Sequence, residues 1–358
     1  MAAPVLASVA TAFPRHYYSQ DQLLAGFRRV WAGRLRHPEL LERLHTNVRV
    51  RGRYLALPME RYLELEGFAA KNAAWIEVAV ELGQRAVAGA LERAGLEPAA
   101  VRWLVFTTVT GVAVPSIDAR LMNRLAFSPY LERIPLFGIG CAGGAAGIAR
   151  LASVLRGQPE QAAVLLAVEL CSLTLRLDDL SLANLVATGL FGDGAAAVVM
   201  LGAQHPLAAP TSRPLPRIVA ARAVFFPGTE RLMGWEVGGA GLQIVLGPEV
   251  PEIARSALPP HVRRFLGEHG LGLEDVAVWV AHPGGPRVIE ALEQGLGLGP
   301  GALELSRQSL AEVGNLSSAS VLEVLQRTLA HRAPAPGQYG VLLAMGPGFS
   351  AELVLLRW

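Results

Sequence analysis

Six nearly continuous apolar runs constrain the fold of this chain more than any other feature of its sequence. A strand that is covered on both faces has a nearly continuous apolar sequence, whereas a strand with one face in solvent alternates apolar and polar residues. The runs are residues 101–109, 162–170, 194–202, 276–282, 339–345 and 351–358. Helical patterns separate them, at 72–95, 143–157, 286–297 and 317–332. Buried strands that alternate with helices predict a layered α/β protein.

The two halves of the chain repeat one pattern. In the first half, Thr108 ends an apolar run, and Cys141 opens a small-residue helix 33 residues later. In the second half, His282 ends an apolar run, and Asn315 opens a helix, again 33 residues later. Glycine turns close both halves, in FGDGAAAVVML and MGPGFSAELVL. A pseudo-twofold arrangement of the halves would bring Cys141, His282 and Asn315 together at its centre.

A proline-rich stretch marks the predicted boundary between the halves. Residues 202–217 carry neither a helical nor a strand period. We therefore expect an N-terminal half at 1–210, which carries the cysteine, and a C-terminal half at 211–358, which carries the histidine and asparagine.

Composition excludes several classes of protein. The 358 residues are 52% hydrophobic with a formal net charge of +2, which suits a large core and gives no basic face for nucleic acid. The first residues lack the basic region of a signal peptide, and no apolar run reaches the ~18 residues of a membrane span. Two cysteines exclude a disulfide scaffold and are typical of a cytoplasmic protein.

Cys141 is the first candidate for chemistry. It stands in GIGCAGGAAGIARL, where glycines let backbone N–H groups approach the sulfur. A helix N-terminus lowers a thiol pKa, so we expect this thiol to ionise easily. The alternative is a small packed core residue, the commonest role of a free cysteine.

His282 and Asn315 are the other two candidates. His282 ends a buried strand before Pro-Gly-Gly, and it also fits a hydrogen-bonded core histidine. Asn315 also fits a helix cap, but Ser317 and Ser318 could cap instead and leave its amide free. The amide and the imidazole would then form an oxyanion hole.

Five motifs in this order resemble one family. GCAGG, LFGDGAAAV, AHPGGP, GNLSSAS and MGPGF are similar to those of the type III polyketide synthases, the chalcone and stilbene synthase-like enzymes. VRGRYLALPMERY and ERLMGWEVGGAGLQIVL resemble bacterial members. The resemblance covers nearly the whole chain and is weakest over about the first 45 residues.

The resemblance implies a thiolase-type fold of duplicated halves in a five-layered αβαβα arrangement, acting as a homodimer. By resemblance, Cys141 carries the acyl starter and growing chain, while His282 and Asn315 promote decarboxylation of malonyl-CoA. Phe191, which alone reads as a core residue beside a turn, matches an aromatic gatekeeper between the CoA tunnel and the cavity. The reaction this implies uses CoA thioesters as substrates, with no metal, redox cofactor or nucleic acid.

The same comparison assigns the substrate cavity. Ile244, Trp235 and Val109 replace residues of the plant enzymes, and Met345 replaces a phenylalanine in the last glycine loop. The expected cavity residues are Val109, Cys171, Thr174, Trp235, Ile244, Ser317 and Met345. Cys171 reads as a second reactive thiol or as a packed lining residue. The letters MGW resemble bacterial enzymes with alkyl or fatty acyl starters, which we therefore expect; pyrone, resorcinol and pentaketide naphthol products stay open.

The expected CoA contacts are basic residues and glycines. Only Arg43 matches a basic tunnel-mouth position of the family. Arg49 and Arg51 alternate with Arg53 as on one face of a strand, where they meet CoA phosphates or solvent. Gly284 and Gly285 would let pantetheine pass close to the backbone.

Three other functions compete with this interpretation. A ketoacyl-ACP synthase III-like enzyme shares the fold and the Cys-His-Asn set, but its histidine motif usually reads HQAN where this chain has HPGG. A papain-like hydrolase lacks a counterpart of GNLSSAS. An inactive thiolase-fold binding subunit would not need an intact Cys141, His282, Asn315 and Phe191.

Overall fold

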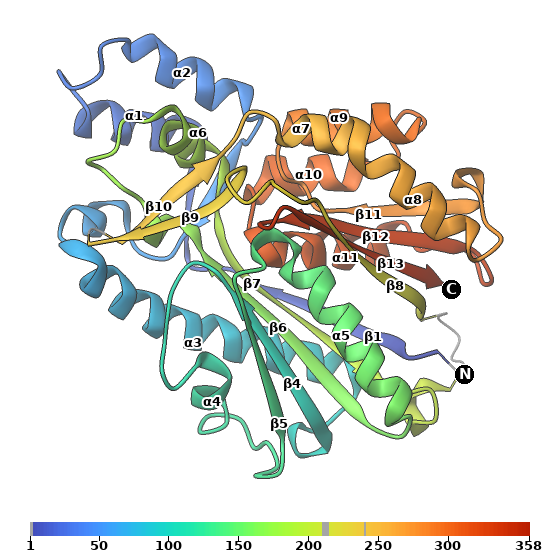
Figure 1. Ribbon diagram of the computed structural model, residues 1–358. Coiled ribbons are helices and arrows are strands. Elements are labelled where there is room, and N and C mark those ends of the chain that lie inside the picture. The colour runs from blue at the N-terminus through green and yellow to red at the C-terminus, as the bar shows by residue number, and fades with distance from the viewer. Residues whose placement is uncertain (1–2, 210–214, 240) are drawn as a thin grey trace.

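A nine-stranded mixed sheet runs through the whole molecule (Figure 1). A computed structural model describes residues 3–209, 215–239 and 241–358, so the predicted boundary between residues 210 and 211 lies outside the described residues. The strand order is β11-β12-β13-β8-β1-β7-β6-β4-β5. The strands are β1 Val5–Ala12, β4 Val101–Thr108, β5 Glu132–Phe137, β6 Ala162–Leu170, β7 Asp193–Leu201, β8 Arg217–Phe225, β11 Val276–Ala281, β12 Tyr339–Gly346 and β13 Ser350–Arg357.

The sheet consists of two halves with the same topology. In the first half, β1 lies antiparallel to β7, β7 antiparallel to β6, and β6 parallel to β4. In the second half, β8, β13, β12 and β11 repeat these three relations in the same order. Only the first half adds a further strand, β5, beside β4. The pair β1 and β8 joins the halves through Val5 and Arg217.

Helices cover both faces of each half-sheet. The helices α5 (Gly143–Gly157) and α11 (Ser320–His331) lie between the halves, since α5 contacts β6 and β13 and α11 contacts β1 and β11. The long helix α3 (Gly67–Ala94) covers the outer face of the first half. The outer helices of the second half are α8 (Leu258–Gly267) and α9 (Pro286–Leu296). Helix, sheet, helix, sheet and helix make the five layers of a thiolase-type fold, which confirms the predicted fold class.

The alternation of side chains along β6 explains the layering. Val164 and Leu166 belong to the core beneath α3, whereas Ala163 and Leu165 belong to the core around α5. Every residue of β6 is buried because successive side chains point to opposite, equally covered faces. The small residues of α5 allow close contact, and a Cβ added at Gly147 would lie 2.3 Å from Leu165.

The six apolar runs are the strands β4, β6, β7, β11, β12 and β13. The four helical patterns fall on α3, α5, α9 and α11, although α3 begins at Gly67, before the predicted start at 72. Two central strands were not predicted, β1 and β8. In the sequence, the short apolar run of β1 bears only on the question of a signal peptide. In the fold, it is a buried strand between β7 and β8. The prediction missed β8 because its burial is mixed and its sequence, RIVAARAVF, is interrupted by arginines.

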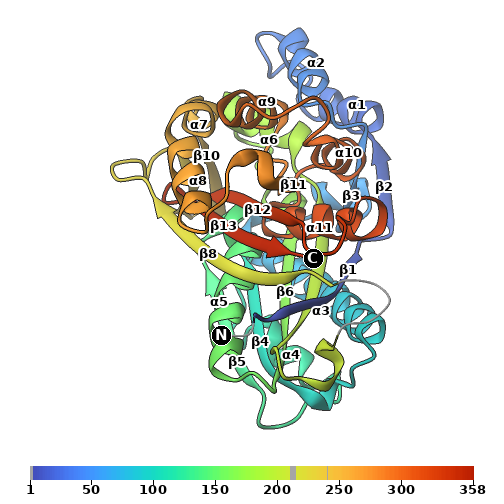
Figure 2. The same ribbon diagram turned by 90° about the vertical axis from the view of Figure 1, so that its right-hand side faces the viewer.

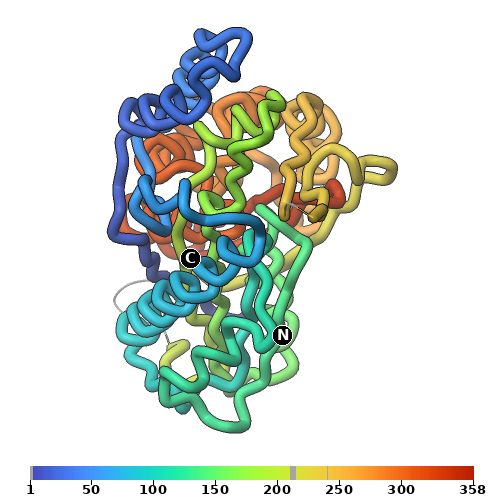
Figure 3. Tube along the Cα trace, turned by 90° about the vertical axis from the view of Figure 1, so that its left-hand side faces the viewer, coloured from blue at the N-terminus to red at the C-terminus, as the bar shows by residue number. Residues whose placement is uncertain are grey.

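Apart from α4, the remaining elements lie toward one end of the molecule, the end farthest from α4 (Figures 2 and 3). They include a hairpin outside the main sheet and helices that lie beside it. Their bounds are β2 His16–Ser19, α1 Gln20–Val30, α2 Pro38–Asn47, β3 Gly52–Leu55, α4 Ile117–Leu121, α6 Leu182–Leu190, β9 Met233–Gly238, β10 Gly241–Leu246, α7 Val250–Glu252 and α10 Glu304–Val313. Within the described ranges, no helix combines the length and the apolar character needed to cross a membrane.

Candidate active site

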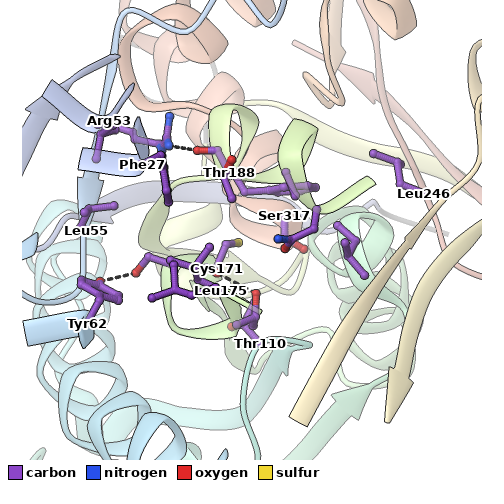
Figure 4. A pocket seen from close by; sticks show the side chains of 18 of the residues that line it. Phe27, Arg53, Leu55, Tyr62, Thr110, Cys171, Leu175, Thr188, Leu246 and Ser317 are labelled. Carbon is purple, nitrogen blue, oxygen red and sulfur yellow. Dashed lines mark hydrogen bonds between the residues drawn. The ribbon is translucent and has the colours of Figure 1, made fainter. Parts of the chain in front are cut away.

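A cavity of about 320 Å³ lies between α1, α6, the β9–β10 hairpin and the loop that carries Cys141. Its lining is largely apolar and includes Phe27, Leu55, Leu175 and Leu246. Figure 4 shows Cys171 and Ser317 near its middle, Arg53 and Tyr62 toward one side and Leu246 toward the other. A concave apolar site of this size suits a small organic substrate.

Cys141 lines this cavity at the start of α5. It lies in a one-turn 3-10 helix, Gly140–Ala142, and its Sγ is 3.7 Å from Ser317 Oγ. The thiol is buried, and burial raises its pKa to about 12 because the charged form loses hydration. Burial therefore contradicts the prediction that this thiol ionises easily.

His282 follows β11 and is held by its backbone. Its N–H donates to Leu343 O on β12 at 2.8 Å. The ring is buried, and neither ring nitrogen has a hydrogen-bond partner within the described part of the chain. Burial lowers the pKa of His282 to about 3, so the imidazole is neutral and can accept or donate one proton.

The Asn315 side chain forms hydrogen bonds to two neighbouring backbone segments. Its Oδ1 accepts from Ser317 N at 2.8 Å, and its Nδ2 donates to Gly284 O at 3.3 Å. Asn315 therefore caps the following turn itself, which was one of the two alternatives, and the other, capping by Ser317 and Ser318, is not observed. Ser318 instead donates through Oγ to Glu169 Oε1 at 2.5 Å.

A series of contacts connects the three candidate residues. Cys141 Sγ contacts Ser317 Oγ, and Ser317 N–H donates to Asn315 Oδ1. Asn315 Nδ2 in turn donates to the carbonyl of Gly284, two residues after His282. The fold thus brings the loops of both halves to one place, as the duplicated pattern predicted. Cys141 is among the cavity-lining residues, whereas His282 and Asn315 are not. The arrangement offers a thiol with a neutral imidazole and an amide on a neighbouring loop.

Phe191 lies where α6 meets this site. It is half-buried, lines the cavity and pairs through its backbone with Asn315. Gly192 N–H donates to Asn315 O at 3.0 Å, and Asn315 N–H donates to Leu190 O at 2.9 Å. The aromatic ring and the amide are therefore held in one rigid backbone unit.

The position of Arg53 differs from the prediction that Arg49, Arg51 and Arg53 share one exposed face of a strand. It is 2% exposed and donates to Gly189 O, at 2.8 Å, and to Thr188 O, both at the C-terminal end of α6. A cation there balances the partial negative charge of the helix end. Arg53 thus supports the segment that carries Phe191 and does not face solvent.

Most of the predicted cavity residues line the cavity. They are Val109, Cys171, Thr174, Trp235, Ile244 and Ser317. Met345 is the exception, because it is buried among the side chains between the second half-sheet and its outer helices. Pro347, two residues later, lines the cavity in its place.

The predicted CoA residues lie on exposed or glycine-rich segments. Arg43 is exposed on α2. Arg49 forms an ion pair with Glu290 of α9 at 3.2 Å, and Arg51 forms one with Glu312 at 3.3 Å. Gly284 and Gly285 precede α9, and Gly285 has φ +154°, which favours glycine.

Sequence reasoning missed two polar clusters beside the cavity. The buried Glu169 accepts from Val109 N at 3.1 Å and Thr110 Oγ1 at 2.9 Å, and burial raises its pKa. The other cluster joins Tyr62, Ser172 and Asp193. A charged residue inside an apolar run, such as Glu169 in AAVLLAVEL, is the signal that could have revealed the first cluster.

Known proteins resemble the chain along its whole length. A family model described as the N-terminal domain of chalcone and stilbene synthases matches residues 2–205, and one described as the C-terminal domain matches residues 217–358. A 1,3,6,8-tetrahydroxynaphthalene synthase of Streptomyces peucetius subsp. caesius is 49% identical and covers 99% of this chain and 93% of its own. A putative chalcone synthase of Bacillus subtilis is 34% identical, with 98% of each chain covered.

A solved structure agrees with these sequence matches. The crystal structure of 1,3,6,8-tetrahydroxynaphthalene synthase from Streptomyces coelicolor, a bacterial type III polyketide synthase, superposes with a TM-score of 0.92. It is 31% identical in sequence, and 99% of each chain is covered. With both family domains matched and the thiolase-type layers in place, the chain belongs to the chalcone and stilbene synthase family and is a condensing acyltransferase, a type III polyketide synthase.

Proposed function

We propose that the chain condenses malonyl-CoA units into a pentaketide and closes it to 1,3,6,8-tetrahydroxynaphthalene. The observation that carries this proposal is the 49% identity to a tetrahydroxynaphthalene synthase over 99% of the chain. The ten ring carbons of naphthalene correspond to five two-carbon ketide units. The compact cavity of about 320 Å³ supports a small polyketide product.

In this proposal Cys141 is the nucleophile. Its Sγ attacks the thioester carbonyl of the starter, and its proton passes to His282. The bond to the CoA sulfur breaks, and the departing thiolate takes the proton from His282. Both residues begin neutral because both are buried, so the ion pair exists only during transfer of the acyl group.

His282 and Asn315 would then promote decarboxylation of malonyl-CoA. Loss of carbon dioxide leaves negative charge on the thioester oxygen, and two neutral N–H donors would stabilise it. The ring nitrogens of His282 have no hydrogen-bond partner among the described residues, which supports this role. The second N–H of the Asn315 amide, beside the one that Gly284 accepts, supports it too. The substrates are CoA thioesters, for which Arg43, Arg49 and Arg51 are the proposed phosphate contacts.

A starter competition tests the product. The purified protein is given malonyl-CoA alone, and then malonyl-CoA with acyl-CoA starters from acetyl to long-chain, and products are read by mass spectrometry. We expect the tetrahydroxynaphthalene mass from malonyl-CoA alone. The second candidate is an alkyl-starter pyrone or resorcinol, which the apolar lining of Phe27, Leu55 and Leu175 supports. Product that appears only with an added acyl-CoA would favour that candidate.

We also propose that the protein is a homodimer through the β5 edge. β5 ends the nine-stranded sheet, so one side of it lacks a partner strand within the described chain. Large apolar side chains are exposed around it, at Val112, Val114, Tyr130 and Phe137. A patch of this kind typically marks an interface. Light scattering should give twice the chain mass, and Phe137→Arg should shift it toward the monomer.

The proposed compartment is the cytoplasm. Cys141 and Cys171 are both free and buried. A mechanism that depends on a thiol nucleophile suits a reducing compartment, where thiols stay reduced.

A further inference from the structure

A second hydrogen-bonded series begins at the wall of the cavity and ends in the protein interior. Tyr62 and Ser172 both line the cavity, and Tyr62 Oη lies 2.5 Å from Ser172 Oγ. Ser172 Oγ in turn donates to the carboxylate of Asp193. The dashed line at Tyr62 in Figure 4 marks the first of these contacts. Three residues from separate segments, 59–63, 171–174 and β7, therefore form one continuous path.

The direction of each hydrogen bond follows from counting protons. Ser172 has a single hydroxyl proton, which goes to Asp193. Tyr62 must therefore donate its own proton to Ser172. Leu57 N–H donates to Tyr62 Oη at 3.2 Å, which occupies one lone pair of the phenol oxygen. The other lone pair is left to accept a proton from a group in the cavity.

Asp193 is placed to receive that proton. It is fully buried, and its carboxylate also accepts from Ser172 N at 2.8 Å and Ala56 N at 2.6 Å. The titratable groups that face it are Arg53, Tyr62 and Cys171. Burial raises the pKa of Asp193 to about 6, so the carboxylate is ionised at neutral pH yet basic enough to hold a proton.

We propose that Tyr62, Ser172 and Asp193 form a proton relay that drives carbon–carbon ring closure of the bound polyketide. This inference rests on the proposed function, whose chain contains β-dicarbonyl units. The enol O–H bond of such a unit breaks, and its proton goes to Tyr62 Oη. The proton of Tyr62 moves to Ser172 Oγ, and that of Ser172 moves to Asp193. The electron pair stays on the substrate as an enolate, whose carbon attacks a carbonyl carbon of the same chain.

The relay returns its proton in the same turnover. Attack on the carbonyl produces an alkoxide, which takes a proton from Tyr62 as Asp193 gives one back through Ser172. No oxidant, reductant or other reactant is needed. Without the relay, the neutral enol oxygen closes on the thioester and gives a lactone. The relay therefore decides between carbon closure, which gives aromatic rings, and oxygen closure, which gives pyrones.

Removal of one hydroxyl group tests the relay. In Tyr62→Phe we expect the ratio of aromatic product to lactone to fall at least tenfold, because general acid–base catalysis contributes about 10²–10⁴-fold. CoA release from malonyl-CoA should stay within about threefold, since condensation takes place at Cys141. The readouts are product masses by chromatography with mass spectrometry and free thiol release.

Tyr18→Phe is the control for structural damage. Tyr18 Oη accepts from Met59 N at 3.1 Å, so both variants lose a phenol acceptor from a backbone N–H of the same segment. Within the described residues, Tyr18 does not line the cavity, and its hydroxyl bonds to Met59 N and not to Ser172 or Asp193. We expect Tyr18→Phe to keep the wild-type product ratio. Ser172→Ala should reproduce the loss and Ser172→Thr, which keeps the hydroxyl, should restore it.

The pH profile adds a readout that a structural role would not move. In the wild type, the aromatic-to-lactone ratio should fall about tenfold between pH 7.5 and pH 5, as Asp193 becomes protonated near pH 6. In Tyr62→Phe the ratio should not depend on this titration.

Three results would overturn the relay. One is an unchanged product ratio in Tyr62→Phe, and another is an equal loss of CoA release and aromatic product. The third is a wild type that makes ketides without any aromatic ring. A wild type that makes no ketide from any starter would instead overturn the proposed function itself, and the relay with it.

Discussion

The two half-sheets have the same strand order, yet equivalent positions in them carry different chemistry. Cys141 and Asn315 each follow a glycine of positive φ, Gly140 at +56° and Gly314 at +74°. Each lies at or just before a one-turn 3-10 helix that leads into a central helix, α5 or α11. One position holds a thiol and the other an amide. The duplicated backbone thus places two residues, Cys141 and Asn315, in similar turns, and their different side chains make the site asymmetric.

Close packing explains why glycine precedes both Cys141 and Asn315. A Cβ at Gly140 would lie 2.5 Å from Pro347, and one at Gly314 would lie 2.9 Å from Leu190 O. The positive φ values are a second reason, since other residues rarely adopt them. The geometry of the two turns is therefore set by the backbone, while the chemistry at each turn depends on the single side chain that follows the glycine.

The largest effect should come from the nucleophile. Cys141→Ala should lower ketide formation by at least about 1,000-fold, because the proposed carrier of the acyl chain is lost. Mass spectrometry of the intact protein should show no acylation at this site. Cys171→Ala is the comparison, since Cys171 is also buried and lines the same cavity. It should lower the rate less than about tenfold; an equal loss in both variants would contradict the assignment.

A smaller effect is expected at the equivalent position in the second half. Asn315→Ala should slow decarboxylation of malonyl-CoA about 100-fold, because one donor to the enolate oxygen is lost. Asn315→Asp keeps the oxygen that accepts from Ser317 N and loses the N–H₂ donor. It should be as slow as Asn315→Ala. Carbon dioxide release is the measurement, and wild-type release from Asn315→Asp would mean that the amide only caps the turn.

The smallest effect concerns the pH dependence of stability at His282. Its pKa is about 3 when folded and about 6.5 when unfolded, so the unfolded chain binds the proton more tightly. The free energy of unfolding therefore falls as the pH drops below about 6.5. Between pH 6.5 and 5.5 the cost for this histidine is about 1 kcal/mol. His282→Gln should remove that part of the loss in urea titrations; an identical pH dependence would contradict the buried, neutral imidazole.

The sequence predicted the strands buried on both faces because such strands leave an unmistakable apolar run. It also predicted the three loops that meet at the site, from two equal intervals and two glycine turns. It does not predict β8, whose mixed burial pattern acquires meaning only beside its neighbours, or β1, a largely buried strand whose short run includes serine and threonine. Met345 is the cavity residue that the structure does not support: the resemblance assigns it by its place in the last glycine loop, but its side chain packs in the core on the outer side of the second half-sheet.

Sequence alone determined the layered fold and the duplicated halves, and it singled out Cys141, His282 and Asn315 as candidates, because burial and backbone conformation follow from local residue patterns. Only the tertiary structure decided the state of those groups. Burial makes the thiol and imidazole neutral, Arg53 turns inward to the end of α6, and Tyr62 meets Asp193 through Ser172. Desolvation and hydrogen-bond partners depend on residues far apart in the chain, so they exist only once the layers have closed.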